Sequence, residues 1–61
     1  MPMIRVQMFP GRTSDQKEAL VKEVTEAIVR TCDAKQEDVW VIIEEVEREN
    51  WALGGTMYSH R

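Results

Sequence analysis

The residue with the clearest potential for proton chemistry stands at the start of the sequence, where Pro2 follows Met1. Initiator methionine is usually removed when the next residue is small, and its removal would leave Pro2 with a free secondary amine. An α-amino group has a pKa of about 7.7 to 8.0, a lysine side chain has one near 10.4, and partial loss of solvation lowers the pKa of an amine further. Pro2 could therefore act as a general base and acid at neutral pH. The alternative is an ordinary chain terminus without chemistry.

The other charged residues offer fewer possibilities. Arg12 follows Pro10-Gly11, a pair that interrupts a strand and favours a turn, so Arg12 is predicted on a loop. There it either binds an anion or is a solvated charge. Glu44 and Glu45 are not expected to share a proton, because neighbouring residues on a strand point to opposite faces.

The cysteine and histidine content argues against a metal site and an internal disulfide. Cys32 and His60 are the only residues of their types and lie far apart in the sequence, so no metal-ligand spacing exists. We predict no metal and no cofactor. Cys32 lies at the edge of an apolar helical stripe and is predicted to be a small buried hydrophobe, while His60 is predicted to be exposed.

Length and charge indicate a small domain that self-associates. A chain of 61 residues buries only about 60% of its unfolded surface, which leaves its free energy of folding near zero. We therefore expect residues 1–61 to form a single domain that gains stability from further subunits. The net charge of −3, with acidic and basic residues interspersed, argues against binding to nucleic acid or to a membrane. No secretory signal or transmembrane segment is visible, so a cytoplasmic location is expected.

Apolar alternation predicts a strand over residues 3–9, and a helix follows it. Thr13 and Gln16 have the spacing of a capping box, which predicts a helix that ends near Cys32. An apolar stripe runs along this helix. The opposite, solvated face carries charges of alternating sign, Glu18, Lys22, Glu26 and Arg30.

A second strand, rich in β-branched residues, is predicted over residues 39–43 and is mostly apolar on both faces, as in a central parallel strand. Strand, helix and strand form a β-α-β unit of the α+β class, whose right-handed crossover places the helix over one face of a two-stranded parallel sheet. The other face and both edges stay unprotected, which favours dimerisation into a larger sheet. Residues 51–55 are predicted to form a short hairpin or a bulge, and residues 56–61 a tail that either adds an edge strand to a neighbour or frays.

Several of these segments, in this order and spacing, resemble the 4-oxalocrotonate tautomerase family across nearly the whole chain. The matching segments are Pro2 at the start of a strand, Gly11-Arg12 at its end, residues 15–17, residues 41–45 and residues 50–55. The resemblance implies a β-α-β protomer with a short C-terminal hairpin, dimers with a four-stranded sheet, and homohexamers built as trimers of dimers. It also implies a cofactor-free isomerase that converts an enol or dienol acid such as 2-hydroxymuconate to its conjugated keto acid, in aromatic hydrocarbon catabolism.

The resemblance implies roles for four residues. Pro2 matches the family's proton-transferring terminal proline, and Arg12 matches an arginine that holds a substrate carboxylate. Trp51 stands where the family usually has an aromatic pocket wall, which lowers the pKa of the amine. Trp40 departs from the pattern, because the best known members have there an arginine that binds the other end of a diacid. Loss of one such donor removes about 3 to 4 kcal/mol of stabilisation from the developing dienolate.

Three explanations of Trp40 are open. Arg48 or Arg5 of some subunit supplies the missing charge, or a second, different chain does, or the substrate has a single carboxylate, as an aryl enolpyruvate has. Trp40 itself would line the substrate site or be buried against a neighbouring subunit. Two alternatives to tautomerisation stand beside these: hydration or dehalogenation of an unsaturated acid, which needs a further base to activate water, and a catalytically silent oligomeric binding module.

Overall fold

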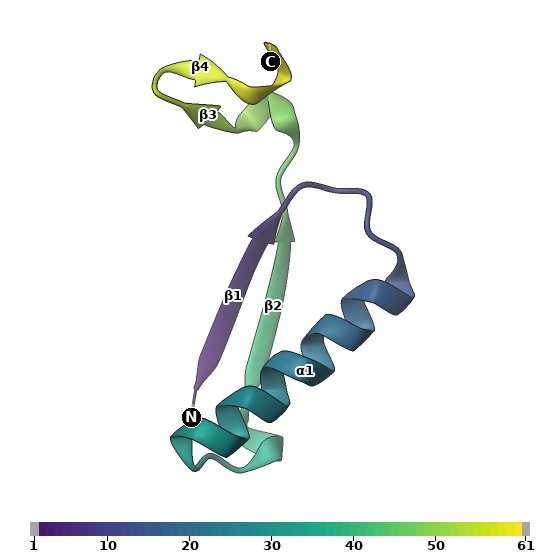
Figure 1. The fold of residues 1–61 in the computed structure, drawn as a ribbon, viewed down its shortest axis with the longest axis vertical. Helices are drawn as coiled ribbons and strands as arrows, with labels where there is room; N and C mark the ends of the chain where they lie inside the picture. Colours follow the sequence, from purple (N-terminus) through teal and green to yellow (C-terminus); the bar gives the residue numbers. More distant parts are fainter. Residues whose placement is uncertain (1, 61) are drawn as a thin grey trace.

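Two parallel strands and one helix form the body of the chain. The computed structural model describes residues 2–60. Its main elements are β1 (Met3–Met8), α1 (Ser14–Cys32) and β2 (Trp40–Glu45). β1 and β2 pair in parallel, and α1 runs back along one face of the sheet between them (Figure 1). The predicted β-α-β unit is confirmed, although β2 begins one residue later and ends two residues later than the strand predicted over residues 39–43.

The start of α1 has the capping box that the sequence predicts. Thr13 Oγ1 accepts a hydrogen bond from the Gln16 backbone N at 3.2 Å, and the Thr13 backbone N donates to Gln16 Oε1 at 2.9 Å. These bonds satisfy amide groups that helix geometry leaves without partners. Because Arg12 directly precedes Thr13, the cap also fixes the backbone beside Arg12.

The two faces of the sheet differ in what covers them. Glu45 Oε2 lies 2.8 Å from Lys17 Nζ of α1, so the face that carries Glu45 is the one beneath the helix. The opposite face, called the open face below, carries Met3, Arg5, Gln7, Trp40, Ile42 and Glu44. On it Met3 is 59% exposed, Trp40 52% and Ile42 36%. A surface of this kind is suited to contact with another protein chain.

A hairpin follows the sheet. After the short turn η2 (Arg48–Asn50), β3 (Ala52–Leu53) and β4 (Thr56–Met57) pair antiparallel. Gly54 and Gly55 between them have φ values of 62° and 85°, the positive-φ geometry of a type I′ turn. The predicted C-terminal hairpin is confirmed, but it spans residues 52–57 rather than 51–55. The prediction of a tail from residue 56 is wrong up to residue 60, because the turn directs residues 56–57 back along β3 and Tyr58–His60 form a further turn, η3.

Residues 2–60 of the single chain form no closed hydrophobic core. None of the side chains in residues 2–60 is fully buried. The Cα radius of gyration is 14.6 Å, whereas a compact domain of this length would have about 10.5 Å. Figure 1 shows why: the hairpin stands beyond the ends of the strands, away from α1. This exposure favours contact with other chains, which would raise the burial toward that of a stable domain.

The prediction that Cys32 is buried is wrong, since its side chain is exposed. The 19 residues of α1 span about 28 Å, whereas the 6 residues of each strand span about 20 Å. The last turn of α1 therefore extends past the sheet. Thr31 in this turn is exposed as well, and its Oγ1 donates to the Ala27 carbonyl oxygen at 2.7 Å.

Two kinds of feature are missing from residues 2–60. No helix there is both long and apolar enough to cross a bilayer. Nor do His, Cys, Asp and Glu side chains of these residues form a group of three or more that could hold a metal ion. His60 is exposed, as predicted.

Candidate active site

Pro2 is half-buried directly before β1, at the end of the sheet where both strands start. Its carbonyl oxygen accepts a hydrogen bond from the Trp40 backbone N at 3.0 Å. This bond extends the pairing of β1 and β2 by one step, so the backbone of Pro2 is fixed beside Trp40. The structure thus brings two of the predicted site residues together. Met1, on whose removal the predicted free amine depends, lies outside the described residues.

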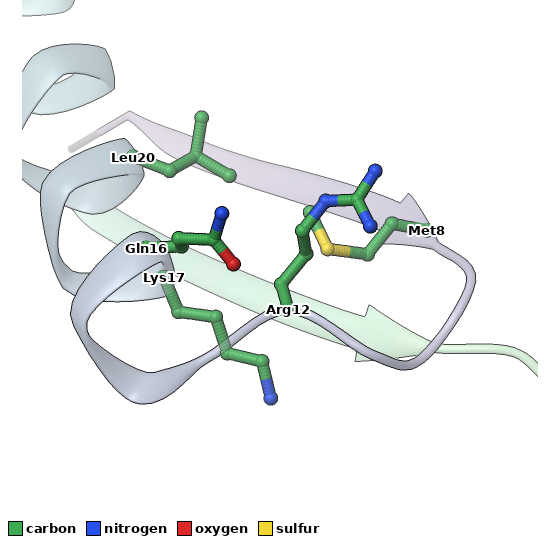
Figure 2. A pocket seen from close by; sticks show the side chains of 5 residues that line it. All are labelled: Met8, Arg12, Gln16, Lys17 and Leu20. Carbon is green, nitrogen blue, oxygen red and sulfur yellow. The ribbon is translucent and has the colours of Figure 1, made fainter.

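Arg12 lies on the loop between β1 and α1, as predicted, beside a cavity of about 300 Å³. The cavity is lined by Met8, Arg12, Gln16, Lys17 and Leu20 (Figure 2). In Figure 2 the Arg12 guanidinium lies beside Met8, while the Lys17 ammonium points away from it. Lys17 is held by Glu45, whereas Arg12 takes part in neither of the two ion pairs among residues 2–60. Its charge is available for a carboxylate ligand.

Trp51 belongs to an aromatic cluster at the same end of the sheet as Arg12. The ring centroid of Phe9, the residue after β1, lies 4.5 Å from that of Trp51 and 5.0 Å from that of Tyr58. The Tyr58 backbone N donates to the Trp51 carbonyl oxygen, which joins the hairpin to the cluster. Arg48 Cζ lies 4.5 Å from the centroid of the Phe9 ring. The cluster provides apolar surface next to the Arg12 loop.

Arg5 and Glu44 form an ion pair on the open face. Arg5 Nε lies 3.1 Å from Glu44 Oε1. This oxygen is shielded from solvent and has no hydrogen bond of good geometry, so the contact with Arg5 is mainly Coulombic. Arg5 is thereby engaged, and so is Glu45 through Lys17 on the other face. The prediction that Glu44 and Glu45 point to opposite faces is confirmed.

The sheet keeps Pro2 and Arg12 apart within one chain. They flank β1, whose 6 residues span about 20 Å. Trp40 lies at the Pro2 end of the strand and Trp51 at the Arg12 end. The predicted site residues therefore fall into two half-sites, Pro2 with Trp40 and Arg12 with Trp51. A pocket that holds both Pro2 and Arg12 must take them from different chains.

Comparison with known proteins identifies the family. Residues 2–61 match the family described as "Tautomerase enzyme". The chain belongs to the tautomerase family. A 2-hydroxymuconate tautomerase of Bacillus subtilis (strain 168) is 42% identical over 59 residues, which cover 97% of this chain and 95% of the relative. The resemblance seen in the sequence is confirmed, and with it the enzyme class, since tautomerases are isomerases.

Solved structures share the fold of this tautomerase-family chain. The crystal structure of YwhB, a homologue of 4-oxalocrotonate tautomerase, has a TM-score of 0.95 and 40% sequence identity and matches 98% of each chain. A heterohexamer 4-oxalocrotonate tautomerase from Chloroflexus aurantiacus has a TM-score of 0.89 and 30% identity, and it matches 97% of this chain and 95% of its own. The predicted tautomerase fold is confirmed.

Two members of the aromatic cluster were not assigned from the sequence. Phe9 was not predicted as a site residue. Arg48 was one of several candidates to supply the positive charge that is missing at Trp40. The signal for Phe9 was its place just before Pro10-Gly11, where a strand end leads into the loop of Arg12. For Arg48 no local signal existed, because its contact with Phe9 joins positions far apart in the sequence of this tautomerase family member.

Proposed function

We propose that the chain converts an enol or dienol carboxylic acid, such as 2-hydroxymuconate, to its conjugated keto acid, with the Pro2 amine of a mature chain as the proton carrier. The observation that carries the proposal is the unpaired Arg12 beside an apolar-lined cavity at the far end of the strand that follows Pro2. A guanidinium there can bind a substrate carboxylate bidentately. The name of the Bacillus subtilis relative supports the same class of substrate.

Pairing of two β1 strands about a two-fold axis would complete the site. One edge of β1 pairs with β2, and the other edge is free within the sheet of residues 2–60. Antiparallel pairing at the free edges gives a four-stranded sheet, in which neighbouring strands lie about 4.8 Å apart. The start of each β1 then lies beside the end of the other. Each site would take Pro2 from one chain and Arg12 and Trp51 from its partner.

The proposed reaction moves one proton and consumes nothing else. The Pro2 amine accepts the enol proton, and the electron pair moves from the enol oxygen through the conjugated system to the carbon that will be protonated, while Arg12 holds a carboxylate of the substrate. The Pro2 ammonium then returns the proton to carbon, which leaves the keto acid. Arg12 would lower the barrier by stabilising the negative charge that develops in the transition state. Apolar walls from Phe9 and Trp51 would exclude water and lower the pKa of the amine.

Hydration or dehalogenation has less support from the described residues. Both reactions need a further base that activates water, such as a second carboxylate. The two carboxylates at the end of β2, Glu44 and Glu45, are engaged with Arg5 and Lys17. Tautomerisation needs only the amine and a carboxylate anchor, so it is the function we propose.

Mixing two inactive variants tests the shared site. A chain with one extra residue in front of Pro2, whose proline nitrogen is an amide, and an Arg12→Ala chain are each expected to have little activity, because each lacks one half of every site. After joint refolding in equal amounts, about half of the dimers are mixed, and one of the two sites in a mixed dimer has both residues, so about a quarter of the wild-type rate should return. The rate is followed by the ultraviolet absorbance of 2-hydroxymuconate. Mixed assemblies that are visible by native mass spectrometry but inactive would contradict the shared site.

We also propose that the chain acts as an oligomer, a trimer of such dimers, in which neighbours cover the open face. Unfolding coupled to dissociation depends on concentration: tenfold dilution should lower the free energy of unfolding per chain by about 0.7 kcal/mol for a dimer and about 1.1 kcal/mol for a hexamer. Urea titrations followed by circular dichroism at several concentrations measure this. Thr13→Ala is the control, because loss of the cap should cost about 1 kcal/mol at every concentration. A urea midpoint that does not change with protein concentration would show that unfolding is not coupled to dissociation.

A further inference from the structure

Arg48 is a second unpaired cation at the end of the sheet that holds Arg12. It lies in η2, is exposed, and packs over the Phe9 ring. We propose that Arg48 binds a second carboxylate of the substrate, so that the enzyme favours enol acids with two carboxylates over those with one. This inference rests on the proposed tautomerase function and adds a specificity-determining residue to it.

The charges near the ends of the strands distinguish Arg48 from the other candidates. Arg5 lies 3.1 Å from Glu44, and Lys17 lies 2.8 Å from Glu45, so a ligand carboxylate would have to compete with a protein carboxylate for either cation. Arg48 takes part in neither of these ion pairs, the only two among residues 2–60. Its guanidinium can accept a carboxylate without breaking an existing pair.

The backbone holds Arg48 close to the Arg12 loop. The Val46 backbone N donates to the Met8 carbonyl oxygen at 2.8 Å, which ties the segment before Arg48 to the end of β1. Phe9, against which Arg48 packs, is three residues before Arg12, so the Cα atoms of Phe9 and Arg12 are at most about 11 Å apart. Two long arginine side chains rooted at one end of the sheet can hold the two ends of a short diacid between them.

The contact with Phe9 prepares Arg48 for this role. A cation over an aromatic ring is weakly stabilised even at an exposed site. A guanidinium that contacts a ring through its face keeps the N–H groups at its edge free for a carboxylate. It also restricts the side chain before the ligand arrives, so less conformational entropy is lost on binding.

The two arginines would then bind different carboxylates of the substrate. Arg12 binds the carboxylate on the enol carbon, which every substrate of the proposed reaction has. Arg48 binds a carboxylate at the other end, which only a diacid has. An aryl enolpyruvate would place its ring against Phe9 and Trp51 and would gain little from the charge of Arg48. Arg48 should therefore control selectivity rather than the chemical step.

The test compares Arg48→Gln with the wild type on 2-hydroxymuconate, a diacid, and phenylenolpyruvate, a monoacid. We expect kcat/KM for the diacid to fall about tenfold to hundredfold, as for loss of a charged hydrogen bond, and that for the monoacid to change less than about twofold. Arg48→Lys keeps the charge but cannot bind a carboxylate bidentately, so its rate on the diacid should lie between those of Arg48→Gln and the wild type. Arg30→Gln, with the same charge loss on the solvated face of α1, should leave the ratio of the two rates unchanged.

The outcomes separate this inference from the proposed function. Wild-type activity with equal losses on both substrates in Arg48→Gln, or with no loss on either, would overturn the role of Arg48 and leave the tautomerase function standing. If the wild type ketonises neither substrate, the proposed function fails. Calorimetry with adipate, a saturated diacid, then decides the binding role: tight binding that Arg48→Gln loses supports it, and equal or absent binding overturns it.

Discussion

A chain with one extra residue in front of Pro2 is expected to ketonise 2-hydroxymuconate about 10² to 10⁴ times more slowly than a chain that begins with Pro2. Within a peptide bond the proline nitrogen is a tertiary amide, which has neither basicity nor a proton to exchange. Because Pro2 is the only proton carrier in the proposed site, acylation removes the whole acid–base contribution. Preparations of both forms, identified by intact mass, can be compared in the ultraviolet assay.

Two further measurements distinguish loss of the amine from general damage. Pro2→Ala keeps a free α-amine, so its rate should lie between those of the two forms. For the free-amine chain, kcat/KM should fall as the pH drops below the pKa of the amine, because the protonated amine cannot accept the enol proton. Desolvation should place this pKa below the usual range of about 7.7 to 8.0. Equal rates with free and acylated Pro2 would rule out its role.

Arg12→Ala is expected to lower kcat about 10² to 10³ times, as for loss of one charged donor in an active site. The loss should be similar for 2-hydroxymuconate and phenylenolpyruvate, because both place a carboxylate on Arg12. This pattern differs from that of Arg48→Gln, which should affect the diacid alone. Steady-state rates on the two substrates give the comparison directly.

Controls for Arg12 come from the same part of the chain. Arg12→Lys keeps the charge without the bidentate fork and should retain an intermediate rate. Lys22→Gln removes a charge from the solvated face of α1 and should change the rate less than about twofold, as expected for a solvated surface charge. Activity of Arg12→Ala close to that of the wild type, in a correctly folded and assembled protein, would show that Arg12 does not anchor the substrate.

Local signals account for most of the secondary structure that could be predicted. The Thr13 and Gln16 side chains bond backbone groups three positions away, so their effect does not depend on the rest of the fold. Gly54 and Gly55 likewise allow the positive φ values that a tight hairpin needs. The family resemblance also depended on the order of such segments, and it was confirmed.

Errors arose where a residue's environment depends on distant segments. Cys32 continues the apolar stripe of α1, yet it is exposed because the helix is longer than the strands beneath it. Residues 56–57 read as a free tail, yet they pair with β3 once the glycine turn reverses the chain. Neither outcome can be derived from a short window of sequence, because both depend on where another element ends.

The sequence by itself determined the β-α-β order, the cap of α1, the hairpin turn and the candidate residues Pro2 and Arg12. Only the tertiary structure decided that Arg48 lies over Phe9 while Arg5 and Lys17 are engaged by carboxylates. The physical reason is the separation along the sequence of the residues that interact. Caps and turns are set by bonds between residues a few positions apart, whereas strand register and side-chain pairing join residues separated by tens of positions.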